Sequence, residues 1–89
     1  MTYSVVFKRA AQKMIGRLPS VYRDNIRGVL RSLAADPTPP GCVRLTTERR
    51  GNFFRIRVGQ YRIIYEVAHE IRIITVIRVG HRKAVYRNL

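Results

Sequence analysis

The chain has 89 residues, of which 46% are hydrophobic and 26% are charged. This length has room for one modest core, so we expect a single domain over residues 1–89. The hydrophobic fraction is too high for a disordered chain, and charges interrupt the sequence too often for a membrane span. The 18 Lys and Arg against 5 Asp and Glu give a net charge of +13, which indicates a polyanionic partner.

Most of the basic residues are arginines, and this choice bears on the partner. Of the 18 basic residues only Lys8, Lys13 and Lys83 are lysines. The guanidinium group is a planar fork of donors that suits phosphate oxygens. Neither helix predicted below sets its basic residues opposite a Trp, Phe or Leu face, and no lipidation or signal motif begins the chain. We therefore expect a nucleic acid, most simply RNA, and no membrane partner.

Cysteine and histidine are scarce. Cys42 is the only cysteine, so it forms no internal disulfide, and we interpret it as a structural thiol in a reducing, cytoplasmic setting. One Cys and two His are too few ligands for a structural zinc site. We expect no metal and no cofactor.

The first third of the chain predicts one strand and two helices. Residues 2–7 are β-branched and aromatic, as in a strand. Over residues 8–18 apolar residues recur at spacings of three and four, which predicts a short helix that Pro19 ends. Ser20 is the expected N-cap of a second helix, and the proline-rich residues 36–41 form the linker after it.

The rest of the chain predicts strands only, at residues 43–47, 53–58, 61–67 and 71–79. One strand, two helices and then a meander indicate the α+β class. We expect the N-terminal strand and the helical hairpin to pack on an antiparallel β-sheet, with a short helical turn after Gly80.

Strand pairing around Gly59-Gln60 gathers several arginines. A two-residue turn there sets Arg57 opposite Arg62 and Arg55 opposite Ile64. Alternation then places Arg55, Arg57 and Arg62 on one face, and on the helix face it places Phe54, Ile56, Val58, Tyr61, Ile63 and Tyr65. A three-residue turn after Val67 would set Glu66 opposite Arg72.

Two arginines directly opposite each other destabilise a strand pair, and such conflicts often mark functional sites. Taken singly, each arginine is equally well explained as a solvated surface residue. The cluster of Arg55, Arg57 and Arg62 favours a phosphate-binding role. Beyond Gly80, His81 belongs to the residue type whose unperturbed pKa suits proton transfer near neutrality, and Tyr86 offers a phenol or a stacking ring.

Several segments together resemble the RelE/ParE superfamily of bacterial and archaeal toxins, on the RelE side. They are the strand-helix-helix start, Phe-Arg-Ile-Arg-Val at 54–58, Tyr-Arg-Ile-Ile-Tyr at 61–65, Val-Gly-His-Arg at 79–82 and Val-Tyr-Arg at 85–87. The resemblance covers nearly the whole chain. It implies a RelE-like fold and a ribosome-dependent endoribonuclease that cleaves mRNA in the A site by attack of a 2′-hydroxyl, near 16S rRNA.

The resemblance also implies roles for individual residues. Arg55 and Arg57 match basic positions that face the phosphate, Arg62 and Arg82 match phosphate-binding arginines, and Tyr86 matches the C-terminal tyrosine. The best-known RelE has lysines at the first two positions. Arginine does not readily deprotonate, so proton transfer would fall to His81 or Tyr86.

The resemblance also implies a cognate antitoxin as protein partner, which wraps the toxin with a helix or an extended segment and blocks the basic face. An acidic or amphipathic segment would suit a charge of +13. The register places Ile64, Ile74 and Val76 on one face, where they would receive apolar antitoxin residues or lie under the C-terminal turn.

Two other functions stay open. A ParE-like protein would inhibit DNA gyrase by binding, without nuclease activity, and it would share the fold. A non-enzymatic RNA- or ribosome-binding module would use the same arginines only to bind phosphate.

Overall fold

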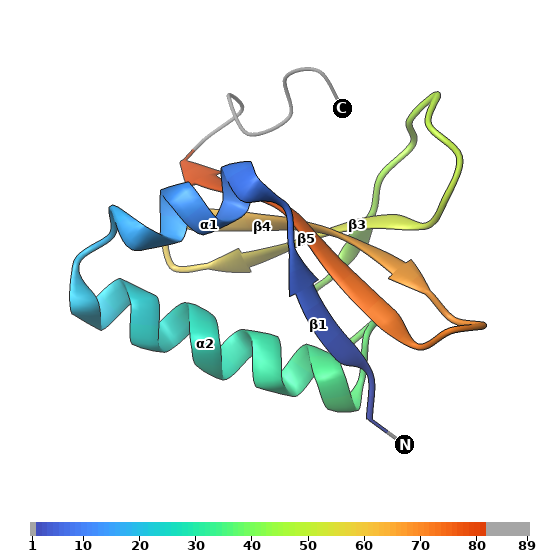
Figure 1. Ribbon diagram of the computed structural model, residues 1–89, viewed down its shortest axis with the longest axis horizontal. Coiled ribbons are helices and arrows are strands. Elements are labelled where there is room, and N and C mark those ends of the chain that lie inside the picture. Colours follow the sequence, from blue (N-terminus) through green and yellow to red (C-terminus); the bar gives the residue numbers. More distant parts are fainter. Residues whose placement is uncertain (1, 82–89) are drawn as a thin grey trace.

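The computed structural model describes residues 2–81, which form a five-stranded sheet and two helices (Figure 1). The elements are β1 (Ser4–Phe7), α1 (Arg9–Gly16), α2 (Ser20–Ala35), β2 (Val43–Arg44), β3 (Phe53–Val58), β4 (Tyr61–Ala68) and β5 (Ile73–His81). The strand order is β1-β5-β4-β3-β2. This arrangement confirms the predicted α+β class.

The sheet is mixed. Strands β2 to β5 form the predicted antiparallel meander, but β1 runs parallel to β5, with Ser4 beside Ile73. The expectation of a wholly antiparallel sheet is therefore wrong at this edge. Side chains alternate with a period of two in both kinds of strand pair, so the sequence pattern carries no information on strand direction.

Several element ends differ from the prediction. Pro19, and not Ser20, occupies the N-cap position of α2, where its carbonyl accepts the amides of Tyr22 and Arg23. β2 is only two residues long, although the amide of Leu45 still donates to the carbonyl of Phe53 at 2.8 Å. None of the helices described within residues 2–81 is long and apolar enough to cross a membrane.

The main core lies between the helices and one face of the sheet. Ala11 of α1 packs there together with the apolar stripe of α2, which includes Ile26 and Leu33. The sheet contributes Phe54, Ile63, Tyr65, Val67, Ile74, Val76 and Val79. The Tyr65 hydroxyl donates to the carbonyl of Pro37 at 2.7 Å, and burial raises the pKa of this phenol. This bond ties the linker after α2 to the sheet.

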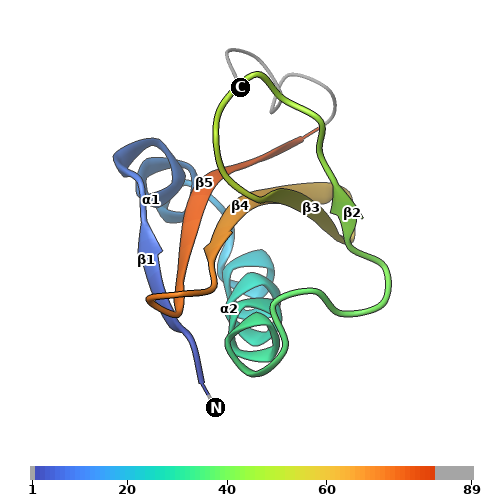
Figure 2. The same cartoon turned by 90° about the vertical axis from the view of Figure 1, so that its right-hand side faces the viewer.

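The opposite face of the sheet, here called the outer face, carries a second and smaller apolar cluster. Phe53, Ile64 and Ile77 are buried in it, and Leu45 packs against them. The connection between β2 and β3 rises on this side of the sheet, away from α2 (Figure 2). The expectation that Ile64, Ile74 and Val76 share a face is wrong, because Ile74 and Val76 belong to the main core.

The turn between β4 and β5 also differs from its prediction. Four residues, 69–72, connect the strands, and Arg72 has a positive φ of 54°. Ala68 therefore pairs with Ile73, and Glu66 lies opposite Thr75 instead of Arg72. The longer turn is joined to the start of β1, since the Tyr3 hydroxyl lies 2.8 Å from Nδ1 of His69.

Gly51 holds the β2–β3 connection close to the sheet. Its φ is +125°, and an added Cβ would run into the Glu66 carboxylate and the Phe53 ring. We expect Gly51→Ala to lower the free energy of unfolding by about 1–3 kcal/mol, because the backbone conformation and the contact both resist a side chain. Urea denaturation measures this change.

Gly28 is the matched control for Gly51. It lies within α2, and nothing surrounds its added Cβ within 4 Å. Gly28→Ala should raise the free energy of unfolding by roughly 0.5–1 kcal/mol, as alanine does in a helix interior. Equal effects of the two substitutions would contradict this account of Gly51.

Candidate functional site

The hairpin of β3 and β4 sets two arginines face to face. Its turn is Gly59-Gln60, with a φ of 60° at Gly59, as the first residue of a type II′ turn requires. Arg57 is paired with Arg62 and Arg55 with Ile64, so the predicted register is confirmed. Phe54 and Ile63 lie in the main core. Because successive side chains on a strand point to opposite faces, all three arginines lie on the outer face.

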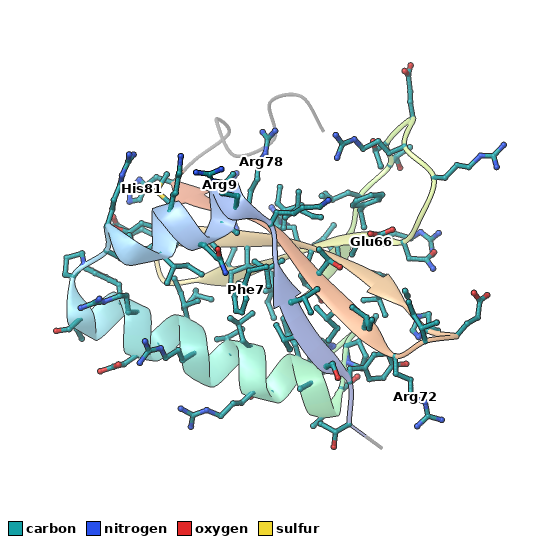
Figure 3. The ribbon with its side chains drawn as sticks, in the orientation of Figure 1. Phe7, Arg9, Glu66, Arg72, Arg78 and His81 are labelled. Atoms are coloured by element: carbon teal, nitrogen blue, oxygen red, sulfur yellow. The ribbon has the colours of Figure 1, made fainter. Side chains whose placement is uncertain are left out.

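Pairing with β5 extends this arrangement to three strands. One row runs Arg57, Arg62, Gly80, and the next runs Arg55, Ile64, Arg78. The four arginines of these rows, Arg55, Arg57, Arg62 and Arg78, are called the arginine face below. Figure 3 shows Arg78 rising from β5 on the side away from α2.

Sequence reasoning did not select Arg78, because a β-bulge decides its direction. Ile64 pairs with Arg78 but Tyr65 pairs with Val76, which leaves Ile77 as the extra residue. Strict alternation from the buried Ile74 and Val76 would point Arg78 toward the helices. The extra residue of the bulge shifts the alternation by one, so that Arg78 points to the outer face. The signal in the sequence is the apolar pair Val76-Ile77 directly before a charged residue.

The arginine face is strongly basic and only partly open to solvent. Arg57 is exposed, whereas Arg55, Arg62 and Arg78 are half-buried. Ile64, which lies between Arg55 and Arg78, is fully buried, as expected where long arginine stems lie over an apolar floor. A hollow of about 140 Å³ at the hairpin end is lined by Arg57, Gly59, Gln60, Tyr61 and Arg62. It offers guanidinium donors to an anion.

His81 does not point onto the arginine face. It pairs with Tyr61, and the two ring centroids are 4.8 Å apart with an edge-to-face geometry. Tyr61 in turn contacts Tyr22 of α2 at 5.2 Å, so the ring of His81 lies on the helix side at the end of β5. Figure 3 shows His81 there, well along the strand from Arg78.

The remaining predicted site residues, Arg82 and Tyr86, lie outside the described residues. The catalytic roles of Arg55, Arg57, Arg62, His81, Arg82 and Tyr86 stay predictions. Within residues 2–81, no group of three His, Cys, Asp or Glu side chains is placed to hold a metal ion. The arginine face itself offers guanidinium charge and hydrogen-bond donors, which can stabilise a negatively charged transition state.

A second surface, here called the helix groove, lies where β1, α1 and α2 meet. Two hollows of about 340 and 240 Å³ share Phe7, Arg27 and Leu30 as lining residues. Phe7, the last residue of β1, is 38% exposed, and it lies on the side of the strand toward α2 (Figure 3). Arg23, Arg27 and Arg31 recur every four residues along α2, so they line one side of the groove. The groove is thus apolar inside and basic along one rim.

Comparison with solved structures gives the fold a clear context. The archaeal RelE–RelB complex from Pyrococcus horikoshii contains a chain that matches with a TM-score of 0.82, at 24% identity over 93% of this chain and 98% of that one. A RelBE toxin–antitoxin complex from Mycobacterium tuberculosis matches with a TM-score of 0.79, at 26% identity over 92% and 100% of the chains. A double mutant of the E. coli toxin RelE in the free state gives a TM-score of 0.71, at 26% identity over 97% and 92%.

Sequence comparison identifies the family directly. No curated protein matches the chain. The family model of the ParE toxins of type II toxin–antitoxin systems, parDE, matches residues 5–86, which is almost the full length. The resemblance to the RelE/ParE superfamily is confirmed, and its fold is that of the RelE structures. The chain therefore belongs to the ParE toxin family within the RelE/ParE superfamily and is a toxin of a type II toxin–antitoxin system.

Proposed function

We propose that this toxin is an endoribonuclease that cleaves mRNA in the ribosomal A site and so inhibits translation. The observation that supports this function is the arginine face, which collects four guanidinium groups on adjacent strands. Two of them, Arg57 and Arg62, are directly opposite each other, an arrangement that weakens the sheet and that an anionic substrate would relieve.

The proposed reaction needs little beyond positive charge and proton transfer. The 2′-hydroxyl of a ribose attacks the adjacent phosphorus, the bond to the 5′-oxygen of the next nucleotide breaks, and a 2′,3′-cyclic phosphate and a 5′-hydroxyl result. Arg57 and Arg62 would bind the phosphoryl oxygens, on which negative charge increases in the transition state. They act as electrostatic stabilisers because guanidinium does not readily lose a proton.

A base must take the proton of the 2′-hydroxyl, and an acid must supply one to the leaving oxygen. We assign these roles to His81 and Tyr86, with Arg82 as a further phosphate ligand. His81 contacts Tyr61 on the helix side, so this assignment requires its ring to turn toward the arginine face when RNA binds. Its exposed position at the strand end leaves space for that rotation.

In vitro translation with the purified toxin tests this function. Primer extension should reveal cuts within the codon in the A site, and the products should carry a 2′,3′-cyclic phosphate and a 5′-hydroxyl. Arg82→Ala combined with His81→Ala should abolish the cuts. If the wild type produced no cuts, or the double variant cut identically, the proposed mechanism would be wrong.

The match to the ParE family model favours a second candidate, a gyrase inhibitor without nuclease activity. In that case the arginine face would have no catalytic role. A supercoiling assay with purified gyrase separates the two candidates. Inhibition of supercoiling without RNA cleavage would establish the ParE-type activity, and cleavage without inhibition would exclude it.

We propose that the partner of this toxin is a cognate antitoxin and that an acidic, amphipathic antitoxin segment occupies the helix groove. The similar chains from P. horikoshii and M. tuberculosis come from toxin–antitoxin complexes, which supports such a partner. Apolar side chains of the segment would contact Phe7 and Leu30, and its carboxylates would pair with Arg27 and its neighbours along α2.

Charge reversal in the helix groove tests this docking site. Arg27→Glu should weaken antitoxin binding at least about tenfold, because it sets a carboxylate against an acidic segment and removes a pairing partner. Isothermal titration calorimetry with the antitoxin measures the change. Arg17→Glu, at the C-terminal end of α1 and outside the groove lining, changes the net charge equally and should have a much smaller effect. Equal losses would mean that only the overall charge matters.

A further inference from the structure

The β-bulge at Ile77 gives the arginine face a fourth member whose position needs a reason. A bulge leaves one residue unpaired and interrupts the hydrogen-bond ladder. Pointing Arg78 outward in this way therefore weakens the pairing of β4 with β5. Here the bulge places Arg78 opposite Ile64, in the same row as Arg55. Without it, strict alternation would turn the guanidinium of Arg78 into the main core beside Val76 and would turn Val79 outward.

The two rows of the arginine face are separate along the strands. Arg55 and Arg57 are two residues apart on β3, a distance of about 6.8 Å. This separation is comparable with that of successive phosphates along an extended nucleic acid strand. Across the strands, Arg55 and Arg78 flank Ile64 from β3 and β5, and their backbones are about 9.6 Å apart. Long side chains from both sides can therefore converge on an anion above Ile64.

The row of Arg57 and Arg62 has no side chain from β5. Gly80 lies opposite Arg62, so Arg57 and Arg62 form this row without a side chain from the third strand. The hollow at the hairpin end lies beside this pair. Each row thus supplies two guanidinium groups. Arg57 and Arg62 lie on adjacent strands, whereas Arg55 and Arg78 lie on either side of Ile64.

We propose that Arg78 and Arg55 form a second phosphate-binding subsite beside that of Arg57 and Arg62, so that the arginine face binds two consecutive phosphates of one RNA strand. This inference rests on the proposed RNA substrate and specifies how it is held. Arg78 is a positioning residue, which would hold the RNA strand in place. The phosphate that undergoes cleavage belongs to Arg57 and Arg62.

Binding of short, uncleavable RNAs tests the second subsite. The probes are a 2′-O-methyl dinucleotide with one internal phosphate and a 2′-O-methyl trinucleotide with two, neither carrying terminal phosphates. Arg78→Met keeps an unbranched stem over Ile64 but removes the guanidinium. We expect it to weaken trinucleotide binding about tenfold, as for a lost charge-assisted hydrogen bond, and to change dinucleotide binding by less than about twofold.

Salt dependence provides a second readout that a purely structural role would not change. Loss of one phosphate contact to a single strand should reduce the slope of log affinity against log salt by about 0.7 for the trinucleotide. Arg78→Lys keeps the charge and should restore the slope. Arg17→Met, which removes a guanidinium at the C-terminal end of α1, is the control and should leave both affinities unchanged. Equal losses for the two probes, or an unchanged slope with Arg78→Met, would overturn the inference.

The same experiment separates this inference from the proposed function. If the wild type cleaves mRNA but Arg78→Met binds both probes normally, the second subsite is wrong and the nuclease stands. If the wild type shows the expected binding pattern but no cleavage, the nuclease is wrong and the subsite stands. Thermal unfolding of Arg78→Met shows whether the variant is folded. If it is not, Arg55→Met provides the test, because it removes the other guanidinium of the same subsite and should give the same selective loss of trinucleotide binding.

Discussion

Replacing Arg62 by glutamine is expected to lower the rate of the proposed A-site cleavage by about 10²–10³-fold, the usual effect of removing one donor that stabilises transition-state charge. Arg62 occupies the central strand of the arginine face, between Arg57 and Gly80, so its guanidinium can reach the phosphate from the middle of the sheet. Single-turnover cleavage on programmed ribosomes measures the rate. Arg17→Gln at the C-terminal end of α1 is the control and should cleave normally.

Substitution of Arg57, which faces Arg62, should not lower the stability of the fold. Two like charges directly opposite each other destabilise a strand pair by a few tenths of a kcal/mol up to about 1 kcal/mol. Arg57 is exposed and faces Arg62, so Arg57→Gln should leave the free energy of unfolding unchanged or raise it by up to about 1 kcal/mol. A clear loss of stability in this variant would show that Arg57 supports the sheet and would weaken the functional explanation of the pair.

The largest expected effect on stability is that of Ile74→Ala. Ile74 is fully buried in β5, which lies between β1 and β4, and it packs in the main core. Removal of three methyl or methylene carbons there leaves a cavity, and we expect a loss of about 2–5 kcal/mol in the free energy of unfolding. For a chain of this size that loss is a large part of the total stability.

Urea denaturation at constant protein concentration measures the effect of Ile74→Ala. Ile71 is the matched control, because it is 68% exposed in the turn before β5. Ile71→Ala should change the free energy of unfolding by less than about 0.5 kcal/mol. A small effect at Ile74 would mean that the core near the β1–β5 edge relaxes to fill the cavity.

The sequence was sufficient to predict the β3–β4 hairpin and the arginines on it. Gly59 at the first turn position allows one register, and alternation then assigns each residue to a face. The cluster of Arg55, Arg57 and Arg62 follows from these two facts alone. This local determination is why the pairing of Arg57 with Arg62 was predicted correctly.

Features that depend on distant contacts were not predictable in the same way. The bulge at Ile77 corrects the phase of β5 so that both Val76 and Val79 are buried, a requirement set by the packed helices. The phase reversal brings Arg78 out and turns His81 toward Tyr61. The four-residue turn at 69–72 likewise depends on a positive φ at Arg72, a conformation that arginine rarely adopts.

The parallel pairing of β1 with β5 has a consequence for the order of assembly. β1 is synthesised well before β5, its neighbour in the sheet, which follows it by nearly seventy residues along the chain. Contacts at such a separation form late in folding. The two rows of arginines likewise need β5 for Gly80 and Arg78. A nascent toxin still lacking β5 thus has no complete arginine face, so the surface proposed to act on translating ribosomes does not exist until β5 has been synthesised.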